Sequence, residues 1–129
     1  MILLLPLGIA ILGAGILFCL ANPHTATRVA LVLGAAEVAV LANIAWHVYH
    51  HGVLTHGKYL RADGLTAFFL INIGLTTGLV LIYASGYMHE VSEDRFFSPR
   101  WFYALVFLFL FTMLGVCLSS NLGLLWIMM

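Results

Sequence analysis

The sequence predicts an all-α, multi-pass membrane protein with about four full transmembrane spans and the start of a fifth. Two observations predict this fold class: 64% of the 129 residues are hydrophobic, and only 8% are charged. Soluble domains carry about 25% charged residues, so the composition excludes a soluble domain. Five Lys and Arg balance five Asp and Glu, which leaves no basic surface for phosphates and excludes a nucleic-acid partner. The lipid bilayer is the expected surrounding.

Polar and charged residues separate apolar segments of roughly bilayer length, and we expect residues 1–129 to form a single membrane domain. The four expected spans are Ile2–Leu20, Val29–Val48, Leu65–Tyr87 and Trp101–Leu118. Pro23 and His24 are expected in the turn after the first span, and Ser98 with Pro99 at the start of the fourth helix.

A fifth apolar stretch, Leu122–Met129, contains eight residues. As a helix it would rise about 12 Å, well short of the roughly 30 Å hydrocarbon core. A half-formed helix in hydrocarbon leaves backbone carbonyls without hydrogen bonds. We therefore expect either that another chain supplies the remaining helices or that this polypeptide is a truncated part of a longer one.

The distribution of Lys and Arg predicts the orientation. With four spans, Arg28, Arg95 and Arg100 share one side, whereas Lys58, Arg61 and the N-terminus share the other. The larger number of positive charges marks the cytoplasmic side. The N-terminus and the segment 49–64 are thus expected outside. The first span has no Lys or Arg before it, which favours a retained helix over a cleaved signal peptide.

Glu37 is the candidate site residue, because it lies near the middle of the second expected span. A carboxyl group at that depth should be protonated, paired or hydrated. One interpretation is a proton relay. The other, which we favour, is a packing carboxyl that hydrogen-bonds a neighbouring helix, since Gly34 and Ala35 allow close approach. A relay needs several ionisable groups in a row, and the expected spans contain no second carboxyl.

We expect no catalytic, cofactor-binding or metal-binding residue. His47 and His51 have the i, i+4 spacing that metal sites use, and His50 and His56 lie near them. No Cys or Glu accompanies these histidines, so residues at the membrane interface are the favoured interpretation. The chain also lacks a phosphate loop, a dinucleotide fingerprint, a nucleophile elbow and a cysteine cluster.

Two motifs flank the third expected span: LRADGLTAFFL at residues 60–70 and YASGYM at residues 83–88. They resemble the beginning and the end of the third helix in antiporter-like subunits. These are the proton-pumping membrane subunits of respiratory complex I, Mrp-type sodium/proton antiporters and group 4 membrane hydrogenases. The runs 108–114 and 120–126 resemble the fourth helix and the start of the fifth. Together with His89 and Glu90, the last two runs are most similar to the hydrogenase-4/formate-hydrogenlyase subunit.

Members of this family are much longer, and their ion-carrying Glu and Lys residues follow the region that Trp126 occupies here. Glu37 matches no motif of the family. The resemblance implies a scaffold part of a proton-translocating, antiporter-like membrane subunit of a hydrogenase-4/complex I-like oxidoreductase complex in a prokaryotic inner membrane. Its partners would be other membrane subunits, and redox cofactors would belong to peripheral subunits. A fragment of a Mrp-type sodium/proton antiporter subunit and an unrelated small membrane assembly protein are the alternatives.

Overall fold

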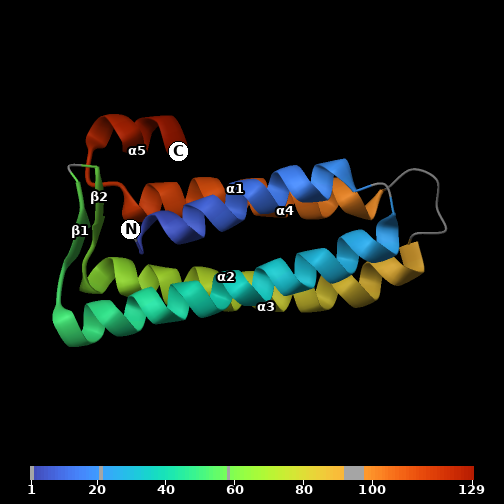
Figure 1. Ribbon diagram of the computed structural model, residues 1–129, viewed down its shortest axis with the longest axis horizontal. Coiled ribbons are helices and arrows are strands. Elements are labelled where there is room, and N and C mark those ends of the chain that lie inside the picture. The colour runs from blue at the N-terminus through green and yellow to red at the C-terminus, as the bar shows by residue number, and fades with distance from the viewer. Residues whose placement is uncertain (1, 21, 58, 92–97) are drawn as a thin grey trace.

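A computed structural model describes residues 2–20, 22–57, 59–91 and 98–129 (Figure 1). The predicted charged positions Lys58, Glu93, Asp94 and Arg95 lie outside the described residues. The elements are α1 (Leu4–Cys19), α2 (Pro23–His51), β1 (Leu54–His56), β2 (Leu60–Ala62), α3 (Gly64–Val91), α4 (Pro99–Leu118) and α5 (Leu122–Met128).

The four longer helices form an up-and-down bundle in which α1 packs beside α4 and α2 packs beside α3 (Figure 1). The N-terminus, the β1–β2 hairpin and α5 lie at the same end of this bundle. We call it the hairpin end. The prediction that the N-terminus and the segment 49–64 share one side is therefore consistent with the arrangement of the helices. Arg28 and Arg100 lie near the opposite end, close to the starts of α2 and α4.

The described residues contain three helices that are long and apolar enough to cross a membrane: His24–His51, Gly64–Met88 and Pro99–Leu118. Helix α1 has only 16 residues, which rise about 24 Å against a hydrocarbon core of about 30 Å. The expected count of four full spans is therefore not confirmed.

Pro23 explains the early start of α2. We expected Pro23 in a turn and the second span from Val29, but Pro23 is an initial helical residue and Asn22 is the N-cap. Proline suits this position because the first helical amide needs no intrahelical partner. At α4 the prediction is confirmed: Ser98 is the N-cap and the helix begins at Pro99.

The segment 49–64 departs from the all-α prediction, because it contains an antiparallel hairpin. Leu54 pairs with Ala62 and His56 with Leu60. Gly57 (φ +65°) in the turn and Gly52 (φ +80°) after α2 occupy the left-handed region, which glycine adopts without steric cost. The Ser120 amide also donates a hydrogen bond to the Tyr59 carbonyl oxygen, at 2.8 Å. The hairpin is thereby tied to the segment after α4.

Helices α2 and α3 approach each other closely over small residues. The buried face of α2 repeats every three or four positions, as expected for one side of a helix. Its members are Ala26, Ala30, Gly34, Glu37, Leu41, Ile44, Ala45 and Val48.

Glycines bring the two helices together, as small residues do in membrane bundles. Gly34 lies against the Leu81 side chain, and Gly74 lies against Leu41. The two contacts also define an antiparallel register between α2 and α3.

We predict that Gly34→Ala destabilises the bundle, because the new Cβ would overlap the Leu81 side chain. Overpacking of this kind typically costs about 1–3 kcal/mol. The loss of unfolding free energy should be smaller in a Leu81→Ala background. Unfolding in detergent micelles measures this free energy for each variant. Gly8→Ala is the matched control, since a Cβ at Gly8 meets nothing within 4 Å. Equal effects at Gly8 and Gly34 would contradict the prediction.

Candidate functional site

Glu37 lies in the interior of the bundle with 0% of its surface exposed. Neither carboxyl oxygen has a hydrogen-bond partner among the described residues. A buried polar group without partners is costly, and an ionised one far more so. The carboxyl group therefore either carries its proton or binds water. Its mid-helix position was predicted from the sequence, whereas its roles as packing group or relay remain predictions.

The register of α2 and α3 fixes the level of Glu37 within the bundle. Gly34 lies against Leu81, and Val38 lies beside Gly78. Because the two helices are antiparallel, Glu37, one residue before Val38, is level with Gly78 and Leu79 of α3.

A second buried polar group belongs to α4. Tyr103 is fully buried, and Thr27 of α2 lies near its hydroxyl group without the geometry of a hydrogen bond. Thr27 precedes Glu37 by ten residues, or about 15 Å along the helix. This pair is therefore separate from the Glu37 level.

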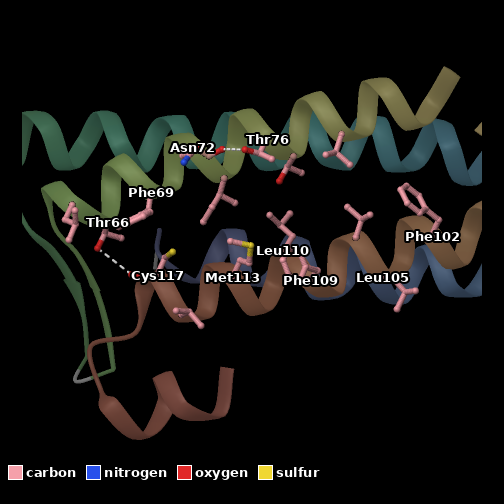
Figure 2. Close-up of a pocket in the computed structure, with 16 residues that line it drawn as sticks. Thr66, Phe69, Asn72, Thr76, Phe102, Leu105, Phe109, Leu110, Met113 and Cys117 are labelled. Atoms are coloured by element: carbon pink, nitrogen blue, oxygen red, sulfur yellow. Dashed lines mark hydrogen bonds between the residues drawn. The ribbon is translucent and has the colours of Figure 1, made fainter. Parts of the chain in front are cut away.

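A groove of about 820 Å³ runs between α3 and α4 (Figure 2). Its lining is mostly apolar, but α3 contributes polar side chains over part of its length. These are Thr66, Asn72, Thr76 and Thr77. The Thr76 hydroxyl donates a 2.8 Å hydrogen bond to the Asn72 carbonyl oxygen. Sequence reasoning missed the groove, although Asn72 and Thr76 have the i, i+4 spacing of one helix face.

Asp63 caps α3 at the hairpin end of the groove. Its Oδ1 accepts a 2.9 Å hydrogen bond from the Thr66 amide, and its backbone carbonyl oxygen accepts one from Ala67. The Thr66 hydroxyl lies 3.1 Å from the same Oδ1 and 3.5 Å from the Cys117 carbonyl oxygen. Its single proton can serve either acceptor. The hydrogen bonds from Thr66 hold the pKa of the Asp63 carboxyl group below its ordinary value.

Three of the histidines considered as metal ligands, His47, His50 and His51, lie in the last turns of α2, and His56 ends β1 of the hairpin. The ring centroids of His47 and His51 are 5.5 Å apart and stacked, and His50 packs against Trp46 at 4.4 Å. Among the residues that the structure describes, no three His, Cys, Asp or Glu side chains form a group that could hold a metal ion.

Residues 54–97 match the family described as NADH-Ubiquinone oxidoreductase (complex I), chain 5 N-terminus. The matched segment includes both strands of the hairpin and all of α3. This match confirms the resemblance to the antiporter-like superfamily. The predicted similarity of residues 108–126 lies beyond the matched segment and stays a prediction. Searches of curated proteins and of solved structures found no match to the chain.

We predict that the Asp63 cap is pH-dependent. Because folding lowers the pKa of this carboxyl group, its ionised form stabilises the protein above the unfolded value of about 3.9. That contribution is lost as the pH falls through the lower, folded-state pKa. Asp63→Asn keeps a capping side chain but removes the titration.

The test is to measure the midpoint of thermal unfolding for the native chain and for Asp63→Asn between acidic and neutral pH. The native midpoint should fall relative to that of the variant as the medium becomes acidic. Parallel pH profiles for the two proteins would refute the prediction.

Proposed function

We propose that this chain is the scaffold part of a proton-translocating, antiporter-like membrane subunit in a complex I-like oxidoreductase complex. The observation that carries the proposal is the family match of residues 54–97. The matched hairpin and α3 lie in a bundle with three helices of membrane-spanning length and apolarity. The hydrogenase-4/formate-hydrogenlyase type and a prokaryotic inner membrane are the branch and location that we propose.

The interior of the bundle supports a scaffold role. Close packing over Gly34 and Gly74 fixes α2 against α3, and Glu37 is the one carboxyl group buried among the described residues. A chain of ionisable groups for continuous ion transfer would then belong to other parts of the assembly. Redox cofactors would be held by peripheral subunits.

The proposed partners are other membrane subunits, including a chain that supplies further helices. Helix α5 offers a surface for such contacts, because Trp126 is 73% and Ile127 is 83% exposed. Large apolar side chains at this exposure pack against lipid or a neighbouring helix in a membrane.

Affinity purification from native membranes tests the assignment. We expect the chain to co-purify with membrane subunits and with a nickel-iron or quinone-reducing arm. Recovery with antiporter subunits and no redox arm would favour the Mrp-type sodium/proton antiporter instead. A stable homo-oligomer without other subunits would overturn the proposal in favour of an assembly protein.

We predict that the hairpin end faces the outside of the cell. By sequence, Arg28, Arg95 and Arg100 belong to the opposite side, against Lys58 and Arg61 in the hairpin segment. The larger number of positive charges favours the cytoplasmic side. A single cysteine at Thr55 in the hairpin should react with an impermeant thiol reagent on intact cells. A cysteine at Ser98 should react only after the cells are opened. The background would carry Cys19→Ser and Cys117→Ser, and the reverse labelling pattern would invert the orientation.

We predict that Glu37→Gln leaves the complex assembled and reduces proton pumping only partly. Glutamine keeps the size and hydrogen-bonding capacity of the side chain while removing the ionisable group. The measurement is proton uptake by inverted membrane vesicles, with native gel electrophoresis to verify assembly. Complete loss of pumping in an assembled complex would make Glu37 an obligatory relay. Loss of assembly would show that the acid form donates a hydrogen bond that Gln does not replace.

A further inference from the structure

We infer that His47 and His51, in the last turns of α2, form a two-histidine site for a divalent transition-metal ion at the hairpin end of the bundle. The ion would be one that imidazole nitrogen binds well, such as Zn2+, Ni2+ or Cu2+. Both histidines precede the matched segment 54–97, so the site goes beyond the proposed function and does not depend on it. For this pair it departs from the expectation of no metal-binding residue.

The two side chains lie on one face of the helix. His47 and His51 are one turn apart within α2, and side chains at this spacing are neighbours on the helix surface. Metalloproteases use the same spacing on a helix to present two histidines to one zinc ion. Because such spacing also arises by chance, the placement of the rings is decisive.

The two imidazole rings lie at a separation that suits a shared ion. Their centroids are 5.5 Å apart, and their planes differ by 28°. A tetrahedral zinc ion bonds each nitrogen at about 2 Å, which places the centroids of two bound imidazoles roughly 5 Å apart. Small rotations of the side chains would therefore bring one nitrogen of each ring onto a common ion.

The pair is open to solvent on one side. His47 is half-buried and His51 is exposed, so an ion reaches the rings without any opening of the bundle. A half-buried side chain also has less rotamer freedom to lose when it binds. Among the described residues no third His, Cys, Asp or Glu completes a group with this pair. Water would therefore fill the other coordination positions, as it fills the open position of catalytic zinc sites.

Local electrostatics favour a cation at this end of α2. The pair lies in the last turns of the helix, where the final backbone carbonyl groups carry partial negative charge. The sequence between Arg28 and Lys58 contains no Lys or Arg. No permanent positive charge within that stretch therefore opposes a bound ion.

His50 differs from the pair, although it lies in the same turns of α2. Its ring centroid is 4.4 Å from that of Trp46 and 5.3 Å from that of Tyr49. Both of these aromatic side chains are exposed, as is common for aromatic residues at a membrane interface. His50 thus packs against aromatic neighbours rather than against a second imidazole, which makes it the matched control.

Copper binding by the full chain in lipid nanodiscs tests the site. Cu2+ is the probe, because nitrogen sites bind it most tightly among the divalent first-row ions. Every protein carries Cys19→Ser and Cys117→Ser, since thiols also bind copper. Electron paramagnetic resonance should show one ion with two imidazole nitrogens. His47→Gln and His51→Gln should each weaken the affinity at least tenfold, whereas His50→Gln should change it less than twofold.

Three results of this titration would overturn the inference. The first is a spectrum with a single imidazole nitrogen. The second is an affinity that neither His47→Gln nor His51→Gln weakens, because the ion would then lie elsewhere. The third is an equal loss in His50→Gln, which would indicate diffuse binding to all histidines at this end of the bundle.

Thermal unfolding with Zn2+ gives a second measurement on the same proteins. An ion that binds only the folded state stabilises that state by mass action. Zn2+ should raise the unfolding midpoint of the chain with both histidines and leave the midpoint of the His47→Gln/His51→Gln double variant unchanged. The midpoint of the double variant without the ion verifies that it folds. An equal rise in both proteins would show an adventitious ion only and would overturn the inference.

Discussion

The close contact between α2 and α3 is the constraint on which the rest of the bundle depends. Hydrophobic burial does not drive helices together inside a lipid bilayer, so their association depends on intimate packing. Gly34 and Gly74 provide that packing for α2 and α3, and Gly13 against Phe107 provides it for α1 and α4. The two tight pairs leave α3 and α4 as the looser neighbours, and the groove opens between them. The same packing thus accompanies a buried Glu37 inside the bundle and a groove between α3 and α4.

Much of the helical framework could be predicted because its signals are local. Long apolar runs identify the spans, and Ser98 with Pro99 marks the start of α4. The hairpin could not be predicted, since its strands have three residues each and are too short to show an alternating pattern. The signal at Pro23 was ambiguous, because proline both follows helices and begins them. The spacing between α1 and α2 was therefore overestimated, and α2 begins six residues earlier than expected.

Only part of the candidate site, likewise, could be predicted from the sequence. Glu37 was evident from the sequence, because a carboxyl group within an apolar span is rare enough to be noticed. The groove could not be predicted, because it is formed by α3 and α4 together and the sequence does not show which helix faces α3. The cap formed by Asp63 could be predicted only in part. An aspartate directly before an apolar helix is a recognised N-cap signal, although its link through Thr66 to Cys117 depends on the tertiary arrangement.

The tie between the hairpin and the segment after α4 has a consequence for sequence variation. The Ser120 amide and the Tyr59 carbonyl oxygen belong to the main chain, as do the groups that pair Leu60 with Ser119. Side chains at these positions can therefore change during evolution without loosening the brace between the two helix pairs. Proline at position 120 is the exception, because it lacks the amide hydrogen that completes the brace.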